Sequence, residues 1–216
     1  MLLLAFDTAT PAVTVALRDG AQIVAQESAV DARRHGELLA VAIDKVLRSV
    51  GADPADLTAV AVGTGPGPYT GLRAGLVTAR VLGSALGIRV DGICTLDVLA
   101  AAAVPNAAGR EFLVATDARR KELYWARYSG RGERVTGPDV CRAVELPAGL
   151  PVAGEGALLY PGLAAEPIAP RYPAAAQLAV LAAERIAAGT PAAPPEPLYL
   201  RRPDAREPGR PKRVTP

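Results

Sequence analysis

Two aspartates end the apolar runs that open the two halves of the chain. Asp7 follows LLLAF, and Asp117 follows FLVAT. A carboxylate at the end of a buried strand, beside a tight turn, can bind magnesium or face a phosphate group. These residue types leave open a nucleotide or phosphate contact at Asp7, Thr8 and Asp117, which is the chemistry of a small ATPase or phosphotransferase.

A second candidate for phosphate binding is the glycine-rich stretch GTGPGPYTGLR at residues 63–73. It lies between a strand pattern and a helix pattern, where nucleotide-binding loops occur. The lysine and hydroxyl residue that a Walker A loop requires after its last glycine are missing from the sequence. Pro66 and Pro68 also remove two N–H donors from the loop. Only a weak phosphate contact is left open, at Gly65 and Gly67.

Side chains for metal or nucleophilic catalysis are scarce. His35 is the only histidine, and Cys94 and Cys141 lie far apart in the sequence. A histidine-pair zinc or iron site is therefore not available within this sequence, and it contains no G-x-S-x-G motif for a serine nucleophile. We expect no catalytic residue, no metal and no cofactor, with two reduced thiols in a cytoplasmic protein.

Length and charge limit the classes of function. The chain has 216 residues, half of them apolar, which suffices for one domain or two small lobes. The net charge of +2 implies no global attraction to nucleic acid or membrane. The apolar start is interrupted at Asp7 and is too short for a signal peptide or a membrane span, so we expect no membrane contact.

Apolar periodicity predicts the elements that position these candidates. LLLAFD, AVTVALRDG and AQIVAQESAV predict a meander of three strands. Residues 32–50 and 71–86 repeat apolar positions at helical spacing, on either side of the strand DLTAVAVG. The strand IRVDGI and the helix TLDVLAAAAV complete this first half.

The second half begins like the first. FLVATDARRKELYWARYSG aligns without gaps on LLLAFDTATPAVTVALRDG, which places Asp117 on Asp7 and Leu123 on Val13. Such a repeat indicates internal duplication and predicts a two-lobed α/β chain of the actin-like or ribonuclease-H-like (ASKHA) fold, with duplicated mixed β-sheet lobes. We place the N-terminal lobe at residues 1–105, the C-terminal lobe at 106–200, and a basic, proline-rich tail at 201–216.

Small residues recur at every fourth position of the second predicted helix. Gly71, Gly75, Ala79 and Gly83 fall on one face, although each internal glycine costs about 1 kcal/mol relative to alanine. Such a face permits close approach of another backbone. That backbone belongs either to the protein's own core or to a partner chain, and the spacing does not distinguish the two.

Several stretches together resemble the TsaB family, also called YeaZ. They are LLLAFDTAT, RRHGELLAVAI, GTGPGPYTGLRAGL, ATDARRKELYWARY and EPLYLR, in the family's order and over nearly the whole chain. The resemblance implies a non-catalytic relative of the enzyme TsaD, which makes the threonylcarbamoyl modification of the adenosine beside the anticodon of tRNA. It also implies a heterodimer with TsaD, joined by the P-loop ATPase TsaE, and a homodimer when the chain is alone. Contact with tRNA is expected only indirectly, through the complex.

Two departures accompany this resemblance. TsaD carries a His-x-x-x-His metal motif, but His35 is followed four residues later by Leu39. The family's usual loop reads GPGSFTG, and here Pro68 and Tyr69 replace its serine and phenylalanine. Both departures fit a protein without chemistry of its own, although the family was once labelled a glycoprotease.

By position, the resemblance assigns the partner interface to the two helices of the N-terminal lobe. The expected interface residues are His35, Leu38, Leu39, Ile43, Leu47, Gly71, Leu72, Arg73, Gly75, Leu76, Ala79 and Arg80. The implied function is a non-catalytic scaffold that binds and stabilises TsaD and recruits TsaE. The alternatives are an actin-like ATPase or phosphotransferase using Asp7 and Asp117 and, least favoured, an M22-type glycoprotease-like metallopeptidase.

Overall fold

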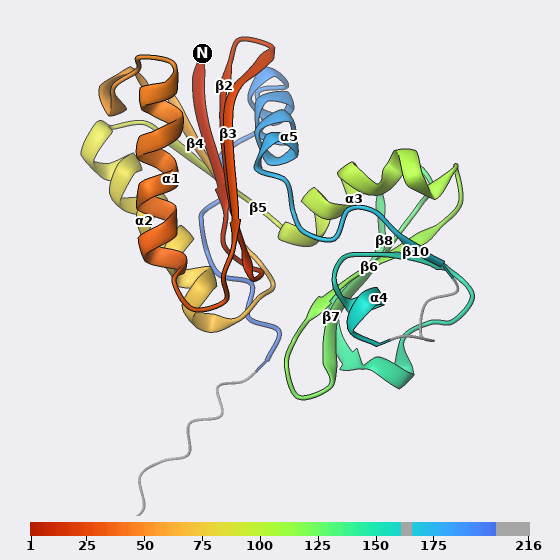
Figure 1. The fold of residues 1–216 in the computed structure, drawn as a ribbon. Coiled ribbons are helices and arrows are strands. Elements are labelled where there is room, and N and C mark those ends of the chain that lie inside the picture. Colours follow the sequence, from red (N-terminus) through yellow and green to blue (C-terminus); the bar gives the residue numbers. More distant parts are fainter. Residues whose placement is uncertain (161–165, 202–216) are drawn as a thin grey trace, which may run out of the picture.

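The first lobe is built on a five-stranded mixed sheet. The computed structural model describes residues 1–160 and 166–201 (Figure 1). The strands of this sheet are β1 (Leu2–Asp7), β2 (Ala12–Asp19), β3 (Gln22–Val30), β4 (Ala59–Gly63) and β5 (Arg89–Ile93). Their order is β3-β2-β1-β4-β5; β1, β2 and β3 pair antiparallel, and β4 runs parallel to both β1 and β5. The three expected strands at the N-terminus are therefore confirmed as a meander.

The second lobe repeats this sheet strand for strand. Its strands are β6 (Phe112–Asp117), β7 (Glu122–Tyr128), β8 (Arg134–Arg142), β9 (Pro151–Ala153) and β10 (Glu166–Ile168). Their order, β8-β7-β6-β9-β10, and their directions match those of the first sheet. Two sheets of identical topology in one chain confirm the duplicated, two-lobed α/β architecture.

The two hairpins differ by one residue at the turn. Asp7 pairs with Thr14, seven positions on, whereas Asp117 pairs with Leu123, six positions on. Leu123 is therefore equivalent to Thr14, and its alignment on Val13 was wrong by one position. The gap-free alignment is correct for the first strand of each hairpin, but a one-residue deletion in the second turn shifts the register of the second strand.

The helices cover the sheets, and two of them pack on the sheet of the other half of the chain. They are α1 (His35–Ser49), α2 (Tyr69–Leu86), α3 (Thr95–Ala107), α4 (Gly156–Leu159) and α5 (Ala175–Ala187), with 3-10 turns at Pro54–Asp56 and Ala143–Glu145. Figure 1 shows α1 and α2 on one face of the first sheet and α5 on the other. In contrast, α3 packs on β6 of the second sheet. None of the described helices is long and apolar enough to cross a membrane.

The chain returns to the first lobe after the second sheet. α5 packs on β1 and β2, and the segment after it follows the edge of the first lobe. There the Gly92 N–H donates to the Ala193 carbonyl at 2.9 Å, and the Leu198 N–H donates to the Thr64 carbonyl at 2.9 Å. The division of the chain after residue 105 therefore separates the strands of the two sheets but not the helices and the C-terminal segment. As a domain boundary it remains a proposal. Residues 202–216 of the expected basic tail lie outside the described residues.

The small-residue face of α2 points into the protein's own core. Gly71, Gly75, Ala79 and Gly83 are all buried. A Cβ atom added at Gly75 would lie 2.5 Å from the Thr8 Oγ1 atom, and one added at Gly83 would lie 2.2 Å from the Val90 Cγ2 atom. The close approach is therefore between α2 and the strands beneath it, which decides between the two interpretations of the spacing.

This inward orientation predicts opposite effects for two neighbouring substitutions in α2. Ala79→Arg should lower the free energy of unfolding by at least about 3 kcal/mol, because it places an unpaired guanidinium in a site with no exposure. Val77→Arg should change it by less than about 0.5 kcal/mol, since Val77 is 58% exposed. Urea unfolding followed by circular dichroism measures both. Equal stability of the two variants would show that the small-residue face is not a core surface.

Candidate functional site

The Asp7 carboxylate lies at the junction of β1, the glycine-rich loop and α3. It is fully buried. Its Oδ1 atom accepts from the Ala9 N–H at 2.8 Å, and its Oδ2 atom accepts from the Thr95 hydroxyl at 2.7 Å. The Thr95 oxygen in turn accepts from the Gly65 N–H at 3.1 Å. Both carboxylate oxygens are thus used to join three segments of the chain.

Two glycines allow the glycine-rich loop to lie directly against this carboxylate and its turn. A Cβ atom at Gly63 would lie 1.8 Å from the Asp7 Oδ2 atom, and one at Gly67 would lie 2.0 Å from the Ala9 carbonyl oxygen. Gly65, between them, has a φ of +86°, a conformation that side chains disfavour. The loop therefore packs against an acceptor oxygen at Gly67, which disfavours an anion at that point.

Thr8 and His35 are also bound within the protein. The Thr8 hydroxyl donates to the Gly71 carbonyl at 2.8 Å and accepts from the Gly75 N–H at 3.1 Å, so it bridges the first turn of α2. The His35 Nε2 atom donates to the Thr10 carbonyl at 2.9 Å, at the buried start of α1. The two side chains attach both helices to the β1–β2 turn.

Burial dominates the electrostatics of Asp7. Desolvation raises the pKa of its carboxyl group above 3.8, against the opposing effects of the hydrogen bonds from Thr95 and Ala9 and of nearby His35. The charged form is therefore costly, although it is fully hydrogen-bonded. Within residues 1–160 and 166–201, no three His, Cys, Asp or Glu side chains gather as a set that could hold a metal ion.

The equivalent corner of the second lobe has diverged. The Asp117 carboxylate is partly exposed; its Oδ1 atom accepts from the Arg119 N–H at 2.8 Å, and its Oδ2 atom pairs with Arg119 Nη1 at 3.1 Å. Buried Glu155 lies behind it, and desolvation, reinforced by the charge of Asp117, raises the pKa of Glu155. Among the described residues, no hydrogen bond or ion pair joins Asp117 to Asp7, and each carboxylate has its own partners.

Sequence reasoning did not identify Glu155 or the bond between Thr95 and Asp7. A glutamate just after the short strand β9 was the only signal for Glu155. The two thiols offer no further chemistry at neutral pH, because burial raises the pKa of Cys94 and of Cys141 to about 11 in each case. They are therefore protonated and weak nucleophiles.

The expected partner interface is placed mostly inside the molecule. The buried members are His35, Leu39, Leu47, Gly71, Leu72, Gly75, Leu76 and Ala79. Only four of the expected residues reach the surface, namely the half-buried Leu38 and Ile43 and the exposed Arg73 and Arg80. The expectation that the glycine face meets a partner is wrong, because that face is needed against Thr8 and β5.

The outward face of the two helices is a different set of residues. A groove of about 410 Å³ runs between α1 and α2 and ends near the turn that follows α1. Its lining includes Ala40, Ile43 and Asp44 from α1 and Thr78 and Leu82 from α2. Val77 and Val81 stand on the crest of α2 and are 58% and 59% exposed.

The two exposed arginines of α2 hold the C-terminal segment. Arg80 Nε donates to the Pro195 carbonyl at 3.1 Å, and Arg73 Nε donates to the Tyr199 hydroxyl at 3.1 Å. These bonds keep both guanidinium groups against the strap of chain after α5. They leave the crest of α2 apolar.

Comparisons with known proteins place the chain among proteins of tRNA modification. The family model of TsaD, tRNA N6-adenosine threonylcarbamoyltransferase, matches residues 22–157. An uncharacterised protein of Mycobacterium tuberculosis is 44% identical over 94% of this chain and 93% of its own length. The tRNA threonylcarbamoyladenosine biosynthesis protein TsaB of Escherichia coli is 34% identical over 59% of this chain and 55% of its own length. The solved structure of YeaZ from Pseudomonas aeruginosa superposes with a TM-score of 0.79 at 27% identity, covering 92% of this chain and 99% of that one.

The pKa of Asp7 predicts a pH dependence that Asp7→Asn removes. Because the pKa is raised in the folded state, the wild type should lose stability as the pH rises from 3.8 through that raised value. The asparagine oxygen can still accept from the Ala9 N–H, and its amide nitrogen can donate to the Thr95 oxygen with the direction of that bond reversed. The variant keeps two contacts without a charge, so it should not show this loss. Asp7→Ala should be about 1–3 kcal/mol less stable, because it leaves the partners unsatisfied. Urea unfolding between about pH 4 and pH 8 measures this; parallel curves for wild type and Asp7→Asn would contradict it.

Proposed function

The chain belongs to the TsaB (YeaZ) family, and from this premise we propose that it is a non-catalytic scaffold of the tRNA threonylcarbamoyladenosine modification complex. It takes part in the biosynthesis of that nucleoside, as its relatives' names indicate. Our proposal adds that it binds and stabilises TsaD, that it recruits TsaE, and that it works in the cytoplasm.

The observation that carries the non-catalytic role is the internal use of Asp7. Both of its oxygens are bound to Ala9 and Thr95, and Gly63 leaves no space beside one of them. Thr8, the other polar candidate of this turn, is bonded to α2. A buried carboxylate whose two oxygens both accept bonds that hold the fold supports a structural role for Asp7.

An ATPase or phosphotransferase is the alternative that one observation favours. Asp117 keeps a partly exposed carboxylate at the end of β6, beside a turn with positive φ at Arg119, Arg120 and Lys121. Calorimetry with ATP and magnesium on the purified chain distinguishes the alternatives. Clear binding that Asp117→Asn abolishes would favour the ATPase over the scaffold.

For the scaffold, we place TsaD on the outward face of α1 and α2. The groove between the helices is lined by apolar residues, including Ala40, Ile43 and Leu82, together with the charged Asp44, Arg48 and Asp53. The valines of the α2 crest, Val77 and Val81, add exposed apolar area beside it. Two such helix pairs can pack closely as a four-helix contact, so a second copy of the chain would use the same face in the absence of TsaD.

The scaffold role predicts that tRNA modification requires the presence of this chain but does not require the Asp7 carboxylate. In a reaction containing threonylcarbamoyl-adenylate synthase, TsaD, TsaE and tRNA, omission of the chain should abolish or strongly reduce product formation. Addition of the Asp7→Asn variant should restore product as well as the wild type does, because Asp7 has no chemical role. Equal modification with and without the chain would refute the scaffold role, and failure of Asp7→Asn alone would indicate catalysis.

The position of the interface predicts the effect of a charge on the α2 crest. Val77→Arg should weaken association with TsaD at least about tenfold, because it buries a cation in an apolar contact, while the monomer stays folded. Val144→Arg is the matched control, since Val144 is 82% exposed and lies in the second lobe. Gel filtration of the mixed proteins and calorimetry measure association. Loss of binding by both variants, or by neither, would place the interface elsewhere.

A further inference from the structure

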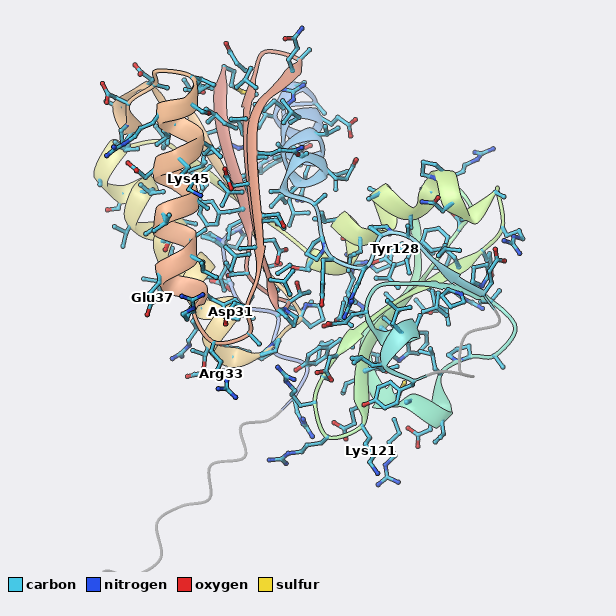
Figure 2. All side chains as sticks on the ribbon, viewed as in Figure 1. Asp31, Arg33, Glu37, Lys45, Lys121 and Tyr128 are labelled. Carbon is cyan, nitrogen blue, oxygen red and sulfur yellow. The ribbon has the colours of Figure 1, made fainter. Side chains whose placement is uncertain are left out.

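Basic side chains from both lobes gather at the edge of the molecule where β1 and β6 end. The sequence DARR occurs twice, at residues 31–34 and 117–120. In each copy the aspartate Oδ1 atom accepts an N–H from the residue two positions on, at 2.8 Å, and the arginines follow on the exposed side of the turn. Figure 2 shows Arg33 of the first lobe and Lys121 of the second along the same lower edge.

An exposed aromatic stack lies at the start of α2. The rings of Tyr69 and Tyr199 are stacked, with centroids 5.6 Å apart and planes inclined by 23°. The Arg73 guanidinium carbon lies 3.9 Å from the centroid of the Tyr69 ring. The two tyrosines remain 53% and 45% exposed, so planar faces and edges are open to solvent in a chain with few aromatic residues.

The C-terminal strap connects this stack to the basic turn of the second lobe. Two residues after Tyr199, Arg201 Nη1 donates to the Ala118 carbonyl at 3.0 Å, and Arg201 Nη2 pairs with Glu122 at 2.8 Å. Residues 199–201 thus span from α2 to the β6–β7 turn. We call the resulting surface the sheet-end rim; it comprises Arg33, Arg73, Arg119, Lys121, Tyr199 and Arg201.

We propose that the sheet-end rim binds RNA directly, with phosphates on its cations and a base stacked on Tyr199. The inference rests on the proposed function, which supplies tRNA as the RNA. A net charge of only +2 for the whole chain means that attraction to a polyanion has to be local. Direct binding of tRNA by the rim would replace the expectation that the chain contacts tRNA only through the complex.

The composition of the rim favours RNA over a protein partner. Cations beside exposed aromatic rings are the combination that binds single-stranded nucleic acid, because phosphates pair with the cations and bases stack on the rings. Three acids beside the rim each pair with an arginine: Asp31 with Arg34, Asp117 with Arg119 and Glu122 with Arg201. The rim's other cations, Arg33, Arg73 and Lys121, supply positive charge beyond these pairs. The exposed valines of the α2 crest, Val77 and Val81, lie outside the rim.

The test measures the affinity of a labelled tRNA transcript for the full chain, alone and bound to TsaD, by fluorescence anisotropy. For the double variant Arg119→Gln/Lys121→Gln we expect at least about tenfold weaker binding near 50 mM salt. The slope of log affinity against log salt should fall by about 1.5 to 2, because two phosphate contacts are lost. The matched control, Arg110→Gln/Arg131→Gln, removes the same charge from two exposed residues next to the start of β6, the end opposite the rim, and should leave both quantities unchanged.

Stacking is tested separately at Tyr199. Tyr199→Ala should weaken tRNA binding about tenfold with no change in the salt slope, because the lost contact is uncharged. Tyr199→Phe keeps the ring and should retain most of the affinity. Thermal unfolding of each variant verifies that the fold is kept.

Four outcomes would overturn the inference. The first is the absence of tRNA binding by the wild type both alone and with TsaD, and the second is equal losses for the rim and control variants. The third is a rim variant that loses TsaD or TsaE while it keeps tRNA affinity, which would make the rim a protein interface. If rim variants bind tRNA normally and still support modification, the rim inference fails while the scaffold function stands.

Discussion

The hydrogen bonds from the Thr95 hydroxyl to the Asp7 carboxylate and from the Gly65 N–H to the Thr95 oxygen connect parts of the molecule that are distant in sequence. Because Asp7 is fully buried, each of its oxygens needs a donor, and an unmatched charge there would cost several kcal/mol. Thr95 begins α3, which packs on the second sheet. The same bonds therefore join the glycine-rich loop of the first lobe to a helix of the second. The loop takes this position only because Gly63 has no side chain.

The duplicated fold shows how one position can serve two purposes. At the end of β1 the aspartate is enclosed and organises the loop, whereas at the end of β6 the equivalent Asp117 stays partly exposed beside Arg119. The second hairpin turn is one residue shorter, and its three residues with positive φ carry cations outward. The turn after β1 therefore has a structural role through Asp7, whereas the turn after β6 presents charged side chains at the surface.

The sequence predicted the strands and helices of the first half and the duplication, because each depends on local periodicity or on a repeat that includes Asp117. It did not predict β8 or β10 in the second half. It did not predict which side of α2 faces inward, since a four-residue spacing of Gly71, Gly75 and Ala79 is the same for a core and for an interface. The register after the second turn was also hidden, because a single deleted residue leaves the alternation of β7 intact. The return of α5 to β1 and β2 depends on packing between remote segments, which no local pattern encodes.

The return of the chain to the first lobe through α5 determines where apolar and basic residues lie on the surface. The strap after α5 binds Arg73 and Arg80, so the two cations of α2 are drawn to one side and the valine crest is left apolar. Arg201, at the far side of the strap, contacts the turn after β6, which adds charge to the sheet-end rim. An apolar helix face and a basic edge are thereby kept apart on one small protein. This separation is what a scaffold needs if it is to hold a protein partner through burial of apolar area while an RNA backbone is held by charge, since neither contact then excludes the other.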